Sequence, residues 1–219
     1  MVLEVHGYLL SPPVLRVIAC LKEKELDYQF IFVDRQAEDN KKEPFLRLNP
    51  FGQLPAFTDG DLTLFESRAI TQYIVHAYAD SGSQLAPEDP KAMAILSMWM
   101  EVEAHQFDVA ASKLNYELVI KPMRNMTSDD KEVAGHEKAL VKVLDVYEER
   151  LKVSQYLAGD DFTLVDLHHT PLIYFLMRTK SKALFEERTH VVAWVRKILT
   201  RSAWSKVQQL IPQNIVVPS

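Results

Sequence analysis

The hydrophobic pattern of this 219-residue chain changes its period near residue 80, and that change constrains the fold more than any other feature. The residues before it alternate short strand-like and helix-like segments, whereas the later residues follow the helical period almost throughout. Residues 80–89 lie between the two patterns and combine small, polar and proline residues, as linkers do. The sequence therefore predicts two domains, 1–79 and 90–219, joined by this linker.

The first domain is expected to follow the order β-α-β, connector, β-β-α, which is that of a thioredoxin-like fold. The predicted strands cover 2–8, 28–33, 56–59 and 62–65, and the predicted helices contain 14–21 and 67–78. Asp59-Gly60 is a hairpin signal between the last two strands. The crossover between the first two strands should be right-handed, which makes those strands parallel.

The second domain has helical periodicity throughout. One helix is expected to begin near Pro90 and to continue toward Leu118, and the others are expected around 140–151, 172–177 and 191–199. In the run Thr163-Leu164-Val165-Asp166 the threonine and aspartate match a capping box ahead of an apolar segment. The predicted fold class is therefore α+β, with an all-helical second domain.

Charge and cysteine content exclude several functions. The 25 basic and 30 acidic side chains give a net charge of -5, which argues against nucleic acid or anionic lipid as partner. Cys20 is the only cysteine, so an intramolecular disulfide, a CxxC pair and a cysteine-rich zinc site are excluded. The histidines, including His168 and His169, match no metal motif, and no metal or membrane span is expected. With no signal-like segment at the amino terminus, we expect a cytosolic protein with a buried, inert Cys20.

The segment Ser11-Pro12-Pro13 places a hydroxyl at the turn between the first strand and the first helix. Serine is a preferred N-cap and proline a preferred first helical residue, so capping alone explains the pattern locally. A thioredoxin-like fold, however, presents its reactive group at this turn. The sequence thus leaves a structural cap and a reactive hydroxyl as alternatives for Ser11.

Two further segments carry polar groups that suit a peptide ligand. In Asn49–Ala56, a cis Pro55 would expose the Leu54 backbone for pairing with an extended peptide, although an ordinary proline turn is the alternative. In Leu64–Ile70, Glu66 and Ser67 stand at a helix start, where free N–H groups and the helix dipole suit a carboxylate. Capping is again the alternative for that pair, and Lys41 adds a cation for a second carboxylate.

These segments give the chain a specific resemblance. Residues 41–45, 49–57 and 64–70 are typical of plant phi-class glutathione transferases, and 107–110 and 157–167 resemble the helical domain of the same family. The resemblance covers essentially the whole chain. It implies the glutathione transferase fold and an enzyme that conjugates reduced glutathione, its co-substrate, to small hydrophobic electrophiles. It also implies reduction of organic hydroperoxides, roles in detoxification and stress response, no permanently bound cofactor, and a homodimer in which Phe51 is a reasonable anchor.

The resemblance also assigns roles to individual residues. Ser11 would be the catalytic serine that hydrogen-bonds the glutathione sulfur, and Glu66 with Ser67 would hold the γ-glutamyl end. Lys41 would bind the glycyl carboxylate, beside Asn40, which stands where the family often has a histidine. The peptide would pair with Leu54, ahead of a cis Pro55 and next to Gln53.

The apolar second substrate is expected to lie between the domains. The candidates for its walls come from both halves of the chain: Leu10, Pro12, Leu114, Tyr116, Leu118 and Val119. The apolar tail 211–219 either covers this site or is an uninvolved surface segment. A ligandin-type carrier of apolar molecules without turnover remains the alternative function, although Ser11 favours the enzyme.

Overall fold

The computed structural model describes residues 2–212 of the chain, so the predicted role for the tail beyond Pro212 lies outside the described residues. The described chain divides into two compact units. The first contains the residues up to Leu85 together with Ser202–Pro212, and the second contains Ala86–Arg201. No helix within residues 2–212 is both long enough and apolar enough to cross a bilayer.

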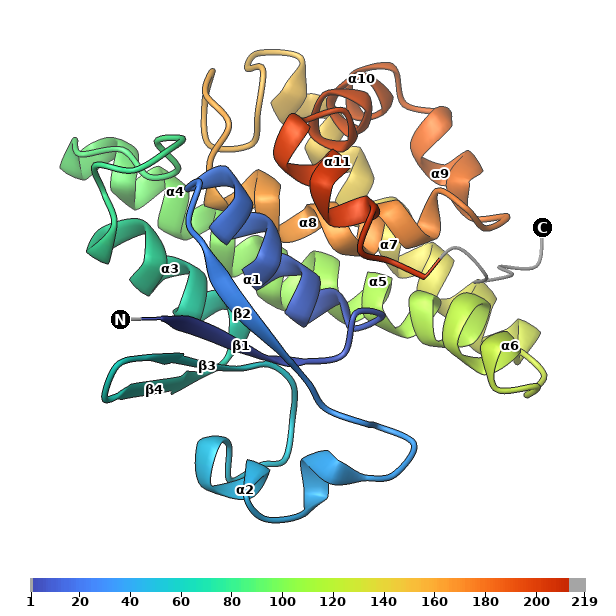
Figure 1. Ribbon diagram of the computed structural model, residues 1–219. Coiled ribbons are helices and arrows are strands. Elements are labelled where there is room, and N and C mark those ends of the chain that lie inside the picture. Colours follow the sequence, from blue (N-terminus) through green and yellow to red (C-terminus); the bar gives the residue numbers. More distant parts are fainter. Residues whose placement is uncertain (1, 213–219) are drawn as a thin grey trace. The chain divides into compact units, whose positions relative to one another are not determined.

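The first unit is built on a four-stranded mixed sheet with the strand order β2-β1-β3-β4. Strand β1 (Leu3–Gly7) pairs parallel with β2 (Tyr28–Phe32) and antiparallel with β3 (Ala56–Asp59), which pairs antiparallel with β4 (Leu62–Phe65). This arrangement confirms the β-α-β and β-β-α order predicted from the sequence. Figure 1 shows α1 (Pro12–Glu23) and α3 (Ser67–Ala77) on one face of the sheet and α2 (Phe45–Leu48) on the other.

Helix α1 lies directly against β1 because the strand ends in a glycine. A Cβ atom at Gly7 would stand 2.7 Å from both methyl groups of Val14, closer than carbon atoms pack. The apolar face of α1 is fully buried, and Cys20 lies within it as a buried free thiol. Burial raises the pKa of the Cys20 thiol far above its usual range, which supports the prediction of an inert cysteine.

The last described helix belongs to the first unit. Helix α11 (Ser202–Gln208) packs against α1, and its apolar residues Ala203, Trp204 and Val207 are buried. The sequence prediction assigned residues 202–212 to the second domain instead. Helical periodicity identifies an apolar face, but it does not identify the domain against which that face packs.

The second unit is helical. Its elements are α4 (Pro90–Val102), η2 (Glu103–Phe107), α5 (Asp108–Asn115), η3 (Tyr116–Ile120), α6 (Lys121–Met123), α7 (Asp130–Leu151), α8 (Leu164–Leu176), α9 (Lys182–Glu186) and α10 (Thr189–Leu199). The segments η2 and η3 are π-helical turns within one long helical run, and the sequence pattern did not predict them. Every residue of α8 is buried, which makes that helix the centre of the unit's core.

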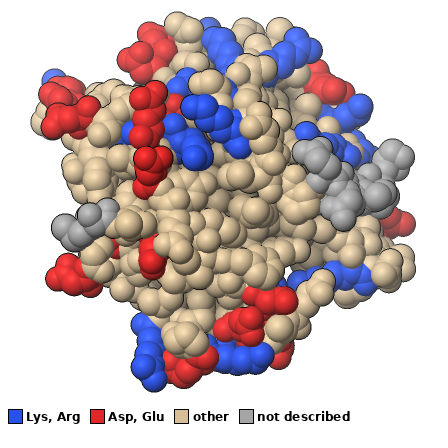
Figure 2. Space-filling model, in the orientation of Figure 1, with Lys and Arg blue, Asp and Glu red and all other residues tan. Residues whose placement is uncertain are grey.

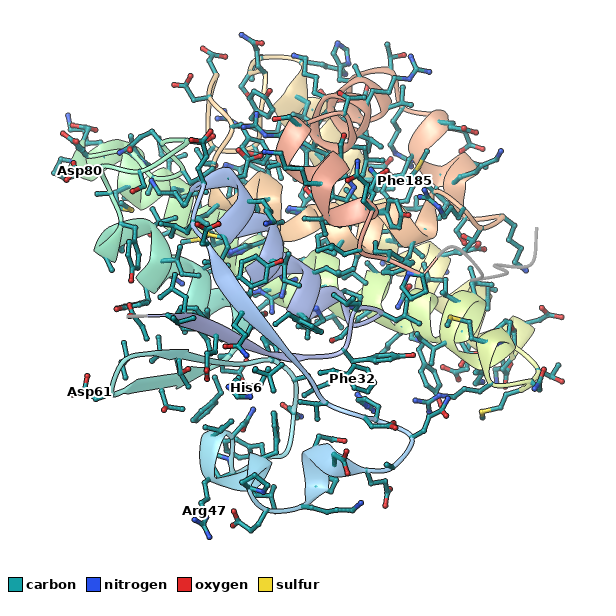
Figure 3. The ribbon with its side chains drawn as sticks, viewed as in Figure 1. His6, Phe32, Arg47, Asp61, Asp80 and Phe185 are labelled. Carbon is teal, nitrogen blue, oxygen red and sulfur yellow. The ribbon has the colours of Figure 1, made fainter. Side chains whose placement is uncertain are left out.

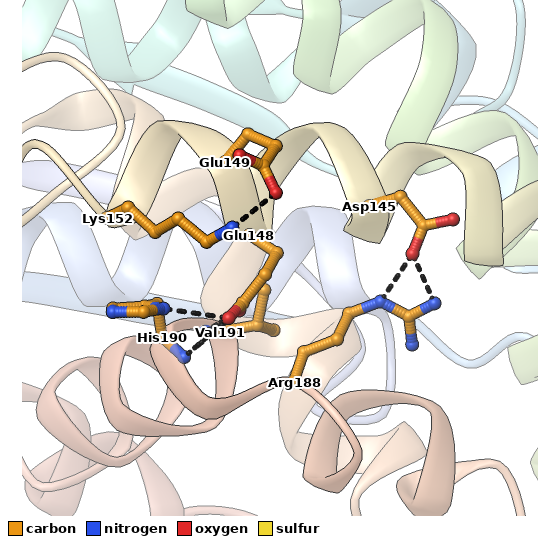
Figure 4. Close-up of polar contacts among 7 residues, drawn as sticks. All are labelled: Asp145, Glu148, Glu149, Lys152, Arg188, His190 and Val191. Carbon is orange, nitrogen blue, oxygen red and sulfur yellow. Dashed lines mark hydrogen bonds and ion pairs between the residues drawn. The ribbon is translucent and has the colours of Figure 1, made fainter.

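Side chains cap the starts of several helices in this unit, among them α4, α7 and α8. The predicted capping box at the start of α8 is present, and the Thr163 N–H donates to Asp166 Oδ2 at 3.0 Å. At the start of α10 the cap comes from another helix, because Glu148 on α7 accepts bonds from the N–H groups of His190 and Val191 (Figure 4). Beside this cap Arg188 donates from Nε to Asp145 at 2.9 Å (Figure 4).

Charged side chains of both signs are mixed on the face drawn in Figure 2, where no large single-sign field is visible. That distribution agrees with the modest net charge of -5.

Candidate functional site

The three polar segments predicted from the sequence meet at one edge of the sheet. The turn that carries Ser11 follows the end of β1, residues 54 and 55 precede the start of β3, and residues 66 and 67 follow the end of β4. In the sheet, His6 pairs with Ala56, and Ala56 pairs with Phe65. The antiparallel pairing therefore brings the end of β1, the start of β3 and the end of β4 to the same edge.

Ser11 occupies the N-cap position of α1, but its hydroxyl makes no cap bond. Its N–H donates to the Tyr8 carbonyl at 3.0 Å, and its own carbonyl accepts from Leu15 N at 3.0 Å. An N-cap side chain accepts from the N–H of the second or third helical residue. Here the second helical residue, Pro13, has no N–H, and the N–H of the third, Val14, makes no bond to the Ser11 hydroxyl. The side-chain cap that explained Ser11 locally is thus absent, and the hydroxyl is available to a ligand.

The loop before β3 is held by its own polar groups. Asn49 donates from Nδ2 to the Gln53 carbonyl at 2.8 Å and accepts from Phe51 N at 3.0 Å. Gly52 has a φ of 59°, in the left-handed region that favours glycine. A Cβ atom there would lie 2.6 Å from the Asn40 carbonyl oxygen, so the loop shape requires a glycine at this position.

Leu54 presents an unused backbone donor and acceptor at this edge of the sheet. The Leu54–Pro55 peptide bond is cis, as predicted, and Leu54 is buried. Within residues 2–212 neither its N–H nor its carbonyl makes a hydrogen bond. Buried backbone groups are nearly always paired in folded proteins, so this position is suited to pair with a ligand backbone. A second cis bond, Glu43–Pro44, was not predicted.

Asn40 and Lys41 both contact this loop. Asn40 is buried, and its Nδ2 donates to the Gly52 carbonyl at 2.7 Å. Its amide nitrogen therefore anchors the loop. Lys41 is exposed and donates to the Phe51 carbonyl at 2.9 Å. An ammonium group has three donors, so Lys41 retains donors and its charge for a carboxylate.

Neither Glu66 nor Ser67 caps α3, although both stand at its start. Glu66 has a φ of 68°, an uncommon conformation for a residue with a side chain, and such positions concentrate at functional sites. Within the described residues its exposed carboxylate makes no hydrogen bond or ion pair. Ser67 is buried, and its hydroxyl oxygen accepts from Nη1 of Arg16 at 2.8 Å.

Arg16 was not among the predicted site residues. It lies on α1 between Leu15 and Val17, both fully buried, and is itself only 1% exposed. Arginine is almost never fully buried unless it is paired. A charged residue inside an apolar helical stripe was the one sequence signal that pointed to it.

The predicted apolar-site residues are distributed over both units and differ in exposure. In the first unit Leu10 is buried and Pro12 partly exposed. In the second unit Leu114 on α5 is buried, and so are Leu118 and Val119 in the π-helical turn η3. Of the four candidates in that unit, only Tyr116 presents a large exposed surface, with 42% of it accessible.

The second unit also has an apolar groove of about 540 Å³ that was not predicted from the sequence. It runs between α7 and the helical segment η2–α5, and its lining includes Val109, Ala110, Val143 and Val146. Within residues 2–212 no three histidine, cysteine or acidic side chains cluster as metal ligands would.

Comparison with known proteins identifies the family of the chain. Residues 1–76 match the family model "Glutathione S-transferase, N-terminal domain", and residues 111–202 match "Glutathione S-transferase, C-terminal domain". A glutathione S-transferase of Hyoscyamus muticus is 63% identical over 204 residues, which cover 93% of this chain and 96% of the relative. Glutathione S-transferase F7 of Arabidopsis thaliana is 50% identical over 205 residues, covering 94% and 98%.

Solved structures give the same result. Glutathione transferase F7 from Populus trichocarpa superimposes with a TM-score of 0.93 at 41% identity, covering 96% of this chain and all of that one. Glutathione S-transferase I from mais, solved in complex with an atrazine glutathione conjugate, has a TM-score of 0.90 at 34% identity, covering 98% and 100%. The chain therefore belongs to the glutathione S-transferase family, and its relatives place it with the plant phi-class members.

Proposed function

We propose that this protein conjugates reduced glutathione to small hydrophobic electrophiles and that Ser11 stabilises the reacting thiolate. The observation that carries the proposal concerns residues 2–212: the Ser11 hydroxyl makes no cap bond, the Leu54 backbone makes no hydrogen bond, and both lie at the sheet edge where α3 begins. Glutathione offers a matching group for each of these features. The family membership of the chain supports the same assignment.

The polar groups at the edge match the two ends and the middle of the tripeptide. The cysteinyl backbone of glutathione would pair with Leu54, with the Gln53 side chain beside it. Its γ-glutamyl carboxylate would meet Ser67 at the positive end of α3, while Glu66 would accept from the ammonium group. Lys41 would meet the glycyl carboxylate, and Asn40 would support this end through its bond to the Gly52 carbonyl.

A hydrogen bond from Ser11 is strong enough to matter for the chemistry. A free thiol has a pKa of about 8.5, and lowering it by roughly two units requires about 2.7 kcal/mol. One hydrogen bond to a charged acceptor contributes about 1.5–3 kcal/mol. Serine acts here as a donor and needs no neighbouring base. Because Pro12 and Pro13 remove two N–H groups from the helix start, Ser11 would carry most of this stabilisation.

The thiolate sulfur would attack the electrophilic carbon and form a carbon–sulfur bond with its electron pair. With an aryl halide the carbon–halogen bond breaks and halide leaves with that bond's electrons, and the thiol proton passes to water. The relative from mais was solved with a conjugate of glutathione, which is the type of product expected here. Tyr116, the exposed member of the predicted apolar site in the second unit, is our candidate for contact with the electrophile.

We also propose that the protein is a homodimer. Phe51 exposes 65% of its surface on the loop before β3, and the apolar groove between α7 and η2–α5 offers a place for a large apolar side chain. Two copies related by a two-fold axis would each insert Phe51 into the other's groove, which is a closed, isologous arrangement. We further propose a cytosolic location and a role in detoxification and stress response, on the basis of the family membership.

The replacement Ser11→Ala tests the catalytic assignment. We expect the Kd for glutathione to stay within about threefold, while kcat/KM with an aryl halide falls about 10- to 100-fold at pH 7. The loss should shrink toward pH 9, where the thiol ionises without help. The matched control is Ser97→Ala, an exposed serine on α4, which should leave both quantities unchanged. Equal turnover of Ser11→Ala and the parent protein at pH 7 would refute the role of Ser11.

A substrate panel separates the enzyme from a carrier. The unmodified protein should be retained on immobilised glutathione and then assayed with aryl halides, isothiocyanates and an organic hydroperoxide. Turnover of at least one class is expected, and oxidised glutathione formed with the hydroperoxide would reveal peroxidase activity. Retention without any turnover would contradict the proposed reaction and favour a ligandin-type carrier.

A further inference from the structure

Arg16 places a positive charge directly behind the hydroxyl of Ser67. Arg16 is 1% exposed and donates from Nη1 to Ser67 Oγ at 2.8 Å, and Ser67 is 5% exposed. The contact joins the apolar face of α1 to the first residue of α3, 51 positions later in the chain. Burying a charge is unfavourable unless its partners compensate, so an apolar residue would be the simpler choice for packing alone.

The bond from Arg16 decides what Ser67 is able to do. A serine hydroxyl has one proton to donate and two lone pairs, whereas a guanidinium only donates. The bond therefore occupies a lone pair of Ser67, and the hydroxyl proton points away from Arg16. Among residues 2–212 that proton has no acceptor. A buried hydroxyl with an unused proton is prepared for a ligand atom that only accepts, and a carboxylate oxygen is such an atom.

We propose that Arg16 is a positioning residue that holds the Ser67 hydroxyl as a donor and makes this end of the site selective for a carboxylate over a neutral amide. The proposal rests on the proposed function, because it treats the ligand as glutathione and its γ-glutamyl carboxylate as the group at Ser67. The start of α3 acts in the same direction, because it is the positive end of a helix dipole.

Glu66 completes the selectivity. Its exposed carboxylate lies one residue before Ser67 and makes no hydrogen bond or ion pair within the described part of the chain. An amino-acid head group carries both an ammonium and a carboxylate, and these two residues offer one partner for each. Arg16 thus determines that Ser67 binds the carboxylate of the head group and not its ammonium.

The test compares glutathione with an analogue in which a carboxamide replaces the γ-glutamyl carboxylate. Binding of each ligand is measured by calorimetry to the parent protein and to Arg16→Met, Arg16→Lys and Ser67→Ala. The matched control is Arg47→Gln, because Arg47 projects outward from α2 (Figure 3) and pairs with Glu43 at 2.9 Å. Thermal unfolding of every variant shows whether it is folded.

We expect the parent protein and Arg47→Gln to bind glutathione at least tenfold more tightly than the amide. In Arg16→Met the Kd for glutathione should rise about tenfold, which corresponds to about 1.4 kcal/mol, while the Kd for the amide rises less than threefold. Turnover at saturating glutathione should stay within twofold, so the effect appears in KM and not in kcat. Arg16→Lys, which keeps the charge, should recover part of the preference.

An equal rise in the Kd of both ligands in a folded Arg16→Met protein would overturn the proposal, because it would indicate a purely structural role for Arg16. So would an unchanged preference for the carboxylate. If Arg16→Met does not fold, Ser67→Ala tests the proposal instead. Its preference for glutathione over the amide should fall below threefold, and a retained preference would refute the proposal. A parent protein that binds neither ligand would instead contradict the proposed function itself, so the two failures are distinguishable.

Discussion

Gly52 is the residue whose backbone most directly limits the shape of the predicted glutathione site. Its φ of 59° and the 2.6 Å approach of a Cβ atom to the Asn40 carbonyl oxygen both oppose a side chain. We therefore expect Gly52→Ala to lower the free energy of unfolding by about 1–3 kcal/mol and to raise the KM for glutathione several-fold. The KM should rise because the loop carries Gln53 and Leu54. Urea denaturation and steady-state kinetics measure the two effects.

Gly135→Ala is the matched control for this prediction. Gly135 lies inside α7, where a Cβ atom would meet nothing within 4 Å. The same replacement should therefore raise the free energy of unfolding by about 0.5–1 kcal/mol, because alanine favours the helix, and should leave the KM unchanged. A Gly52→Ala protein as stable as the parent would show that the loop has room to adapt.

Single residues show where sequence reasoning succeeds and where it stops. The sequence placed Ser11, Leu54 and Ser67 next to predicted strand ends, and the structure brings those strand ends together at one edge of the sheet. Their role in binding a ligand stays a prediction. The bond between Arg16 and Ser67 was not predicted, since it joins positions 51 residues apart through the packing of two helices. Asn40 likewise matched a ligand-binding position, but the structure directs its amide nitrogen to the Gly52 carbonyl.

At the scale of elements, α10 depends on a carboxylate that belongs to α7. Burial of Glu148 opposes its ionisation, but the bonds from the His190 side chain and from the N–H groups of Val191 and His190 outweigh this, so the pKa of Glu148 is lowered (Figure 4). A carboxyl group whose pKa is lower in the folded state stabilises the fold above its unfolded pKa. That contribution is lost as the pH falls through the folded value.

Glu148→Gln should therefore lower the Tm at pH 7. The Tm difference between parent and variant should become progressively smaller below pH 4.5, because protonation then removes the charge of the parent carboxyl. Thermal unfolding followed by circular dichroism between pH 3.5 and 7.5 measures the difference. Glu149→Gln is the control, because Glu149 is an exposed partner of Lys152 and surface pairs contribute little (Figure 4). A Tm difference that does not change with pH would exclude the carboxylate as the source of the stabilisation.

The hairpin strands and the start of α8 followed local signals closely, whereas changes of helix type did not. The helix expected to be the last, at 191–199, is followed by α11, which was not predicted. Strands β3 and β4 begin and end where the hairpin signal and the alternation predicted, and the capping box of α8 is present. The π-helical turns η2 and η3 interrupt a segment predicted as one regular helix. A π turn inserts one residue into a helical period, and it depends on tertiary packing that a hydrophobic pattern does not record.

At the scale of the whole molecule, the strand order brings the predicted site residues to one edge of the sheet. The packing of α11, the last described helix, against α1 adds residues 202–212 to the first unit. The strand order follows from the β-α-β and β-β-α connections, which were readable in the sequence. The placement of α11 against α1 was not, because the chain returns to the first unit after more than 110 residues of the second. Such a return needs only an apolar face on α11, here Ala203, Trp204 and Val207. The sequence does not show which apolar surface buries that face.

The proposed dimer makes a prediction about assembly. Phe51 and Phe32 expose similar fractions, 65% and 60%, but only Phe51 is assigned to the partner's groove. Phe51→Ser should convert a particle of twice the 25.1 kDa chain mass into a monomer in sedimentation analysis, because the two-fold contact loses its apolar anchor twice. Phe32→Ser should remain dimeric. Val146→Glu, which charges the lining of the groove, should reproduce the effect of Phe51→Ser, and dimers in both variants would show that the groove receives no side chain from a second copy.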